Sequence, residues 1–236
     1  MTAVLHRLRR EESGMTLIEL LVASTLGIIV ITAAFQVLIV GMKGTQRVAA
    51  GVDTVQRGRQ AMENVTRELR TQICLPTLTG PQPAILSGDG TTVSFYADLG
   101  DENLTPDLRT ISFAGNQITE KTYANTGTTT SPAFSGYPGT PATTRVLATN
   151  VVQDGSTPYL RYYKFSTSDP IEPSIQIGST AALTSDEKAR VVQINVTFVV
   201  RPGGPNADPA SATIMDNKVF VRTSSASDPE RSPACL

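Results

Sequence analysis

The first feature of the chain is a long apolar block near its N-terminus. Leu17–Met42 contains a single charged residue, Glu19, and every charged side chain is absent from Leu20 to Met42. At about 1.5 Å per residue, that uncharged run extends about 35 Å as an α-helix, enough to cross a hydrocarbon core of roughly 30 Å. A basic stretch precedes the block, which orients this end toward the cytoplasm and sends the rest of the chain outward.

The helical pattern continues beyond the apolar block. Apolar residues recur there at spacings of three, four and seven, at Val48, Val52, Val55, Met62, Val65, Leu69 and Ile73. The opposite face is charged, with Asp53, Arg57, Arg59, Glu63, Arg67, Glu68 and Arg70. We therefore predict one long helix from about Met15 to Ile73, ended by the nearby Pro76. Its second half is amphipathic and should pack on a folded domain.

From Leu75 onward the apolar residues alternate, which predicts β-strands. The candidate strands are Thr91–Ala97, Arg109–Phe113, Gln117–Tyr123, Arg145–Val151, Leu160–Phe165, Val191–Val200 and Lys218–Thr223. The pair Gly115-Asn116 is typical of a tight turn and makes Ile111–Tyr123 a predicted hairpin. Val191–Val200 is long and apolar, so we expect it to be a central strand. The predicted fold class is α+β, a long N-terminal helix packed on an antiparallel sheet domain.

Two segments between the predicted strands have the composition of loops. Ala124–Thr144 is rich in Thr, Ser, Gly and Pro, and Arg201–Ala212 contains a Pro-Gly-Gly-Pro sequence. Such residues favour turns and contribute little apolar surface. We therefore expect the first loop to bury little apolar area.

The composition argues against catalysis. His6 is the only histidine, and it lies in the charged N-terminal stretch. A histidine base or a Ser–His or Cys–His pair is therefore not expected in the folded part, and the protein is interpreted as a non-enzyme. The acidic residues Asp98, Asp101, Glu102 and Asp107 lack regular calcium-ligand spacing. Neither a metal nor a cofactor is expected.

The charge balance also bears on nucleic-acid binding. The formal net charge is −1, whereas nucleic-acid-binding domains usually show a basic excess. A group of aromatic residues offers either a stacking platform for a single strand or one half-buried face of a sheet: Tyr159, Tyr162, Tyr163 and Phe165. DNA or a surface ligand stays open as a partner, although nothing in the sequence requires one.

Three interpretations of the apolar block compete. A cleaved secretory signal has a shorter apolar core, of roughly 7–15 residues. A plain single-span anchor fits the length but gives no reason for Glu19. A carboxylate at or inside the membrane is costly without a partner, which makes Glu19 a functional candidate.

The residues around the start of the block distinguish these interpretations. The run Ser13-Gly14-Met15-Thr16-Leu17-Ile18-Glu19-Leu20-Leu21-Val22 resembles the processing site of type IV prepilins and type II secretion pseudopilins. The resemblance implies that prepilin peptidase cuts after Gly14 and methylates the new amino terminus at Met15. It also implies that Glu19, at the fifth mature position, pairs with the amino terminus of a neighbouring subunit during assembly.

The same resemblance implies a division of the chain into four segments. Residues 1–14 are a leader peptide that is removed, and residues 15–42 are the transmembrane and assembly half of the long helix. Residues 43–74 are its amphipathic half, and residues 75–236 form a β-rich globular domain. The expected location is the cytoplasmic (inner) membrane, with one span and the globular domain outside the cytoplasm, followed by a pilus or the cell surface.

The size and order of the segments most resemble the larger minor pilins of the W type and the J-type pseudopilins. The preferred function is a minor pilin that helps to initiate or cap a type IV pilus, with other minor and major pilins as partners. The alternatives are a pseudopilin of a type II secretion system and a membrane-anchored binding module.

The two cysteines form a candidate disulfide. Cys74 lies at the end of the predicted helix, and Cys235 lies near the C-terminal end of the sequence. Because an exported domain meets an oxidising environment, we expect them to be bridged. The alternative is two independent thiols.

Overall fold

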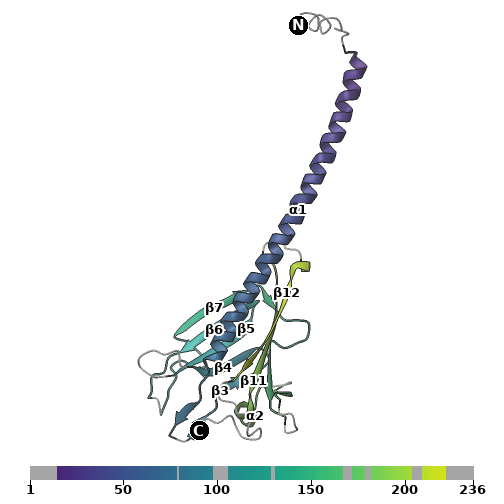
Figure 1. Ribbon diagram of the computed structural model, residues 1–236. Coiled ribbons are helices and arrows are strands. Elements are labelled where there is room, and N and C mark those ends of the chain that lie inside the picture. The colour runs from purple at the N-terminus through teal and green to yellow at the C-terminus, as the bar shows by residue number, and fades with distance from the viewer. Residues whose placement is uncertain are drawn as a thin grey trace, which may run out of the picture. The chain divides into compact units, whose positions relative to one another are not determined.

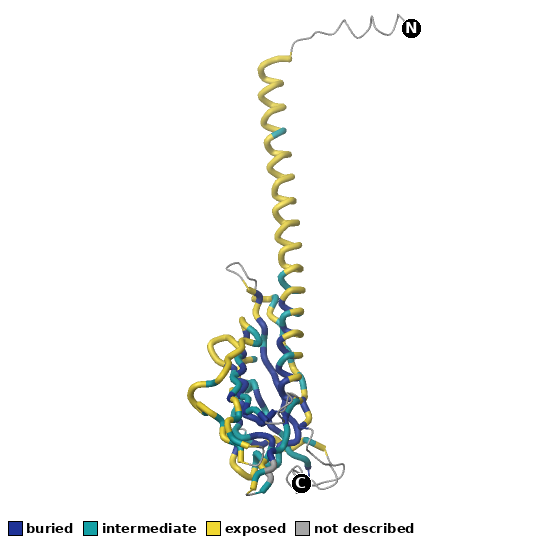
Figure 2. Tube along the Cα trace, turned by 90° about the vertical axis from the view of Figure 1, so that its left-hand side faces the viewer, coloured by how far each residue is buried: buried dark blue, intermediate teal, exposed yellow. Residues whose placement is uncertain are grey.

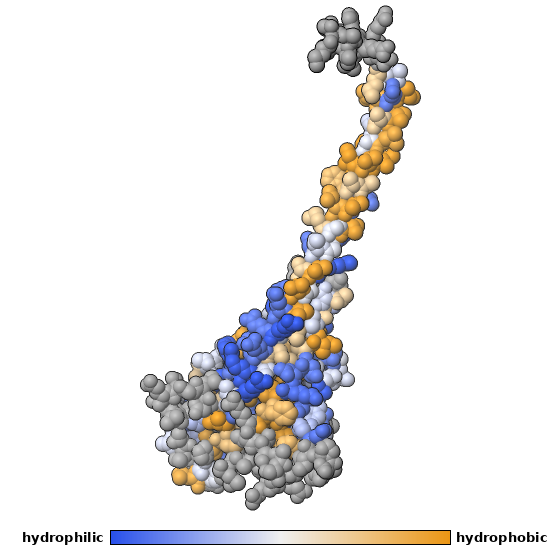
Figure 3. Space-filling view, in the orientation of Figure 1, coloured by the Kyte–Doolittle hydropathy of each residue, from blue (hydrophilic) through white to orange (hydrophobic). Residues whose placement is uncertain are grey.

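The computed structural model describes residues 15–78, 80–97, 106–128, 131–166, 172–178, 182–203 and 209–221. The chain divides into two compact units, Met1–Ala49 and Ala50–Leu236. Helix α1, Leu17–Arg70, begins in the first unit and ends in the second. In the first unit its side chains are almost all exposed (Figure 2), and its surface is predominantly apolar (Figure 3).

Helix α1 has the extent that the sequence predicts, apart from its last turn. The segment contains no proline before Pro76, so nothing interrupts its backbone hydrogen bonds. The helix ends at Arg70 because the next residues pair with the sheet. Gln72 forms a β-bridge with Ala97, and the Ile73 amide donates a hydrogen bond to the Tyr96 carbonyl at 2.9 Å.

The second unit contains two antiparallel five-stranded sheets (Figure 1). The first has the order β3-β4-β5-β6-β7, formed by Ile85–Gly88, Thr92–Ala97, Asp107–Ala114, Gln117–Tyr123 and Thr143–Thr149. Gly115 and Asn116 join β5 to β6 with φ values of 59° and 60°. Two positive φ values in succession are those of a type I′ turn, which confirms the predicted hairpin.

The second sheet has the order β10-β9-β11-β12, formed by Ile175–Ile177, Leu160–Lys164, Gln193–Val200 and Thr213–Phe220. Strand β8, Val151–Val152, also pairs with β11. The expectation of a central strand at Val191–Val200 is therefore confirmed. The smaller elements are the β1–β2 hairpin, helix α2 and the 3₁₀ helix η1, at Leu75–Thr77 with Gly80–Gln82, Ser185–Arg190 and Pro209–Ser211.

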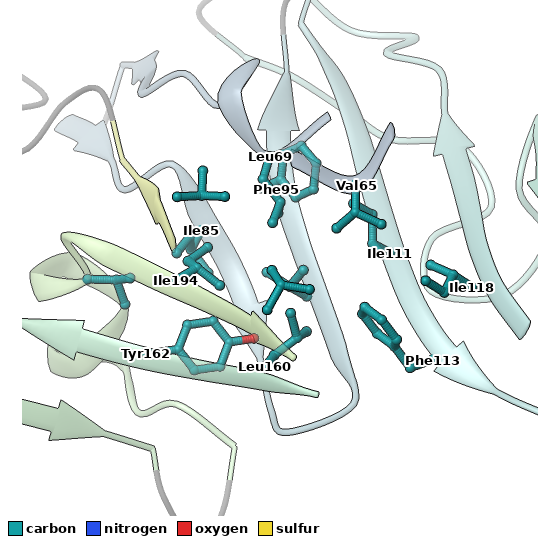
Figure 4. Close-up of a cluster of buried hydrophobic side chains, with 14 of the residues drawn as sticks. Val65, Leu69, Ile85, Phe95, Ile111, Phe113, Ile118, Leu160, Tyr162 and Ile194 are labelled. Carbon is teal, nitrogen blue, oxygen red and sulfur yellow. The ribbon is translucent and has the colours of Figure 1, made fainter. Parts of the chain in front are cut away.

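One apolar core joins α1 to both sheets and accounts for the predicted α+β class, which is confirmed. Figure 4 shows Val65 and Leu69 from α1 in this cluster, together with side chains from both sheets. The two sheets contribute Ile85, Phe95, Ile111, Phe113, Ile118, Leu160, Tyr162 and Ile194. Each large apolar side chain that is fully buried contributes about 1.5–3 kcal/mol to folding. The second half of α1 is therefore part of the core of the domain.

The buried face of α1 differs from the predicted stripe. Val48 and Val52, which were expected to be buried, are exposed by 69% and 52%. The buried positions are Thr54, Gly58, Ala61, Met62, Val65, Thr66, Glu68 and Leu69. Several of these are small or polar. At Gly58 the helix packs against the Met215 side chain of β12, with which an added Cβ would collide. A search for large apolar residues cannot find positions that are buried because they are small.

The assignment of Glu68 to the polar face was wrong. Its side chain is 5% exposed and accepts hydrogen bonds from Arg109 and Arg145, both at 2.7 Å. Glu120 accepts from the same two arginines, Arg109 at 2.7 Å and Arg145 at 2.9 Å. Two carboxylates and two guanidinium groups thus alternate, so that each buried charge is compensated. This ion cluster attaches α1 to strands β5, β6 and β7.

Arg145 is the most exposed residue of the ion cluster, and its pKa reflects the two neighbouring carboxylates. Burial lowers the pKa of Arg145, but its hydrogen bonds to Glu120 and Glu68 and their negative charges outweigh burial, so its pKa lies above the ordinary value.

The first predicted loop is attached to the domain through two aromatic side chains. Its aromatic residues pack on a second small core formed by Leu75, Tyr96, Leu108 and Tyr123. Phe134 stacks on Tyr96 with ring centroids 5.6 Å apart, and Tyr137 meets Tyr123 edge-on at 5.2 Å. The expectation of little apolar burial agrees with the structure, since none of the described residues of 124–144 is buried. Two half-buried aromatic rings nevertheless attach the loop to the domain.

Candidate assembly site at the start of helix α1

The candidate site begins where α1 begins. Thr16 lies just before the first helical residue, and its carbonyl accepts hydrogen bonds from the amides of Glu19 and Leu20 at 3.0 and 3.1 Å. Its hydroxyl oxygen also accepts from the Glu19 amide at 3.3 Å. Thr16 is therefore the N-cap, and Glu19 is the third residue of the helix. Met15 precedes the cap, and Gly14 lies outside the described residues.

Glu19 has the position of a capping-box glutamate, but its carboxylate makes no capping bond among the described residues. The sequence Thr16-Leu-Ile-Glu19 has the Thr-x-x-Glu form of a capping box, in which the glutamate returns a hydrogen bond to the N-cap amide. Helix α2 completes such a box: the Glu187 carboxylate accepts from the Thr184 amide at 2.9 Å. In the part of the chain that the structure describes, the Glu19 carboxylate has no hydrogen-bond or ion-pair partner. Glu19 is exposed, so its carboxylate is open to a group from another molecule.

The segment after Glu19 is long and apolar enough to cross a membrane. Among the described residues α1 is the one helix that meets this criterion, and none of its most apolar window is buried inside the protein. A core helix of a soluble domain would be largely buried. Exposed apolar side chains extend from Leu17 to Met42, so this surface needs lipid or other helices to cover it.

The hydroxyl side chains in this segment are satisfied within the helix itself. The hydroxyls of Ser24, Thr25 and Thr32 donate to the carbonyls of Leu21, Val22 and Ile28 at 2.9, 2.9 and 2.7 Å. Because an unpaired polar group in hydrocarbon is costly, these bonds make the residues compatible with a membrane. Glu19 therefore differs from the hydroxyl-bearing residues of the apolar segment, since its carboxylate has no such bond among the described residues.

The other residues that the sequence proposed as sites lie away from the start of α1. Cys74 is disulfide-bonded, whereas Cys235 lies outside the described residues, so their pairing stays a prediction. Asp98, Asp101 and Glu102 also lie outside the described residues. Of the proposed stacking platform, Tyr162 is 1% exposed, and Tyr159 stacks on Phe113 with centroids 4.8 Å apart. These two rings are therefore packed inside the domain and are not a surface for bases.

Tyr162 has a structural role instead. Its hydroxyl donates to the Asp89 carbonyl at 3.0 Å, which links β9 of one sheet to the β3–β4 connection of the other. Burial raises the pKa of Tyr162 well above its ordinary value, and the Asp89 charge raises it further. The phenol is therefore a neutral donor.

Comparison with known families gives one match at this site. Residues 9–35 match the family model described as the prokaryotic N-terminal methylation motif. Comparison with curated proteins finds no match. The matched range includes Gly14, Met15, Glu19 and much of the apolar segment.

The matched motif supports a type IV pilin-like protein with a membrane-anchoring N-terminal helix. It implies processing by prepilin peptidase and methylation, and it is typical of structural subunits and not of enzymes. The match ends at residue 35, so it carries no information about the β-rich part.

Proposed function

We propose that the chain is a minor pilin, a structural subunit that helps to initiate or cap a type IV pilus after prepilin peptidase removes residues 1–14. The observation that carries the proposal is the position of Glu19. It lies one helical turn after Met15, at the start of an exposed apolar helix, and its carboxylate has no partner among the described residues.

The assembly step follows from the cost of that carboxylate. In lipid an unpaired carboxylate is disfavoured. In a bundle of subunits it pairs with the ammonium group of a neighbouring Met15, and the attraction strengthens as water is excluded. The free energy gained on pairing favours transfer of the subunit from the membrane into a filament. Residues 15–42 are thus the anchoring and assembly segment, residues 43–74 the amphipathic half of the helix, and residues 75–236 the β-rich domain.

The size of the second unit supports a minor and not a major subunit. Two five-stranded sheets follow the helix, whereas major pilins are usually simpler after the helix. This is the pattern of the larger W-type minor pilins and of the J-type pseudopilins. The proposed partners are prepilin peptidase, other pilins and the cytoplasmic membrane, with the domain outside the cytoplasm before it reaches a pilus or the cell surface.

The direct test replaces Glu19 by Ala. We expect unchanged membrane levels and unchanged cleavage, with incorporation into sheared pili reduced about tenfold, which corresponds to about 1.4 kcal/mol of lost pairing. The measurement is the ratio of protein in the sheared-pilus fraction to total membrane protein. Glu19→Asp is the matched control, because it keeps the charge. Equal incorporation of both variants and the wild type would remove the assembly role and favour a plain anchor.

Processing provides an independent test. The mature chain is expected to begin at an N-methylated Met15, as mass spectrometry of membrane-extracted protein can show. Gly14→Val should block cleavage, since a Cβ obstructs close backbone approach in the peptidase. Membrane insertion should persist because the apolar segment is unchanged. An unprocessed Met1 terminus in cells that hold the peptidase would refute the proposal.

The pseudopilin alternative predicts a different phenotype. Deletion of the protein would then abolish secretion of exported proteins and leave the number of pili unchanged. The minor-pilin proposal predicts the opposite result, fewer pili with secretion intact.

A further inference from the structure

The second sheet has one face in the core and one face that is polar. Successive side chains of a strand point to opposite faces of its sheet. In β11, Ile194 and Val196 belong to the apolar core. Gln193, Asn195 and Thr197 therefore lie on the opposite side, together with the residues that pair with them in β9 and β12. We call this side of the second sheet the outer face.

One row of the outer face places an amide between two aromatic rings. Gln193 is paired in register with Tyr163 of β9 on one side and with Phe220 of β12 on the other. Tyr163 is half-buried, and Phe220 is 55% exposed. Because neighbouring strands lie about 4.8 Å apart, the two aromatic residues are separated by about 10 Å across the sheet. The row therefore offers two stacking surfaces with a polar group between them.

The amides of the outer face are buried but not fully paired. Gln193 and Asn195 are 4% and 7% exposed, and the Gln193 amide nitrogen donates to the Asn195 side-chain oxygen. The Gln193 Oε1 and Asn195 Nδ2 atoms have no partner among the described residues, and neither atom is fully enclosed. Buried side-chain amides are normally paired. One acceptor and one donor are therefore left open to a group from another molecule.

The charges of the outer face nearly cancel. Arg161, which pairs in register with Asn195, donates to the Thr197 hydroxyl at 2.7 Å, and that hydroxyl donates to Asp216 at 2.6 Å. The Arg161 guanidinium and the Asp216 carboxylate are 3.5 Å apart. Lys218, on the other side of Asn195, has no ion-pair partner among the described residues. The outer face thus favours a ligand with little or no charge.

We propose that the outer face binds a neutral glycan chain. A sugar hydroxyl both donates and accepts, so the hydroxyls of one ring can donate to Gln193 Oε1 and accept from Asn195 Nδ2. The C–H face of a sugar ring is apolar and packs on the exposed ring of Phe220, and the next sugar reaches Tyr163. The outer face lies outside the methylation motif, so the inference does not depend on assembly through Glu19.

Two other ligand classes fit the outer face less well. A nucleic acid is bound mainly through its phosphates, which require a basic excess, whereas Asp216 here offsets Arg161. An extended peptide gains its main-chain hydrogen bonds at the edge of a sheet and not on its face.

The test measures binding to the full chain by fluorescence anisotropy, in micelles of a detergent without a sugar head group. The probes are cellotetraose and chitotetraose, each with an uncharged dye, and the comparison probe is an oligothymidine. We expect saturable binding of at least one oligosaccharide, unchanged when salt is added. The oligothymidine should bind at least about tenfold more weakly. Absence of binding by both oligosaccharides, or tighter binding of the oligothymidine, would overturn the proposal.

Two substitutions in the same strand locate the site. Phe220→Ala should raise the dissociation constant of the bound oligosaccharide by about tenfold, because it removes a stacking surface. Ile214→Ala is the matched control, since Ile214 lies on the same face of β12, is 59% exposed, and pairs with Val199 at the far end of the strand. We expect no change for this variant. Equal effects of the two substitutions would contradict the proposed site.

Asn195→Asp separates binding from a structural role. The carboxylate keeps the acceptor for Gln193 and lacks the free donor of Nδ2. Because Arg161 and Lys218 flank position 195 in register, the added charge should leave the melting temperature unchanged while oligosaccharide affinity falls. A lower melting temperature with unchanged affinity would refute the binding role of Asn195. These measurements involve no filament, so a negative result leaves the test of Glu19 unaffected.

Discussion

The two parts of helix α1 have the same secondary structure but opposite surroundings. Up to Ala49 nearly all side chains are exposed and predominantly apolar; from Ala50 to Arg70 one face is buried in the domain core. The residues that matter differ accordingly. In the first part, the candidate functional residue Glu19 is the charged residue in an otherwise uncharged apolar segment. In the second part, small and charged residues are buried because the sheets supply matching shapes and charges.

The two glutamates Glu19 and Glu68 give the largest expected contrast. Glu68→Ala removes a carboxylate shared by Arg109 and Arg145 and leaves the ion cluster with an excess positive charge, which should lower the free energy of unfolding by about 3 kcal/mol. Glu19→Ala should change it by less than about 0.5 kcal/mol, as for exposed sites without specific contacts. Denaturant unfolding of the full chain in detergent, followed by tyrosine fluorescence, measures both. Similar losses would show that the two carboxylates do not differ in role.

Substitutions at two glycines, one in each part of α1, should give intermediate changes in the free energy of unfolding. Gly58→Leu forces a side chain into the space of Met215 and should destabilise the domain by about 2 kcal/mol. Gly44→Leu should instead strengthen the helix by about 1 kcal/mol at most, because a Cβ there has no atom within 4 Å among the described residues. Thermal unfolding of the full chain compares the two. If Gly44→Leu lowers both stability and pilus incorporation, Gly44 has a contact that the isolated chain does not show.

The smallest expected effect compares the two Thr-x-x-Glu sequences. Hydrogen bonds from the Thr184 amide and hydroxyl lower the pKa of Glu187 from its ordinary value of 4.5. Since the folded pKa is below the unfolded one, the resulting stability is present above the unfolded pKa and is lost as the pH falls through the folded pKa. An NMR titration should show Glu187 ionising below the ordinary value, and Thr184→Ala should raise its pKa only part of the way toward 4.5, because the hydroxyl is removed and the backbone amide remains. A titration of Glu187 unaffected by Thr184→Ala would contradict the hydrogen bond from the Thr184 hydroxyl to Glu187.

Much of the fold could be predicted from local sequence. The length of α1, the β5–β6 hairpin and the central position of β11 follow from apolar period and turn residues, which act over a few positions. The short strands β1, β2 and β8 contain too few residues for any period to be visible. The pairing of β8 also depends on β11, which is distant in the sequence.

The candidate sites divide in the same way. Gly14, Met15 and Glu19 form a contiguous motif, so the sequence alone points to them. The ion cluster depends on residues brought together only by folding: Glu68 meets Arg145 across 77 positions. Helical periodicity placed Glu68 on the polar face, since no local signal indicates that two arginines on distant strands would compensate its burial.

The packing of α1 against β12 sets an order on folding. The Asn217 side-chain amide donates to the Thr66 hydroxyl at 3.3 Å, across 151 positions of the chain. Helix α1 is synthesised first, yet its inner face borders β12, which is synthesised among the last elements. Contacts of such long range close slowly, because the intervening chain must lose its conformational entropy first. The buried face of α1 must therefore remain incompletely covered until synthesis has passed residue 217, and during that interval it is open to chaperones, to proteases and to aggregation.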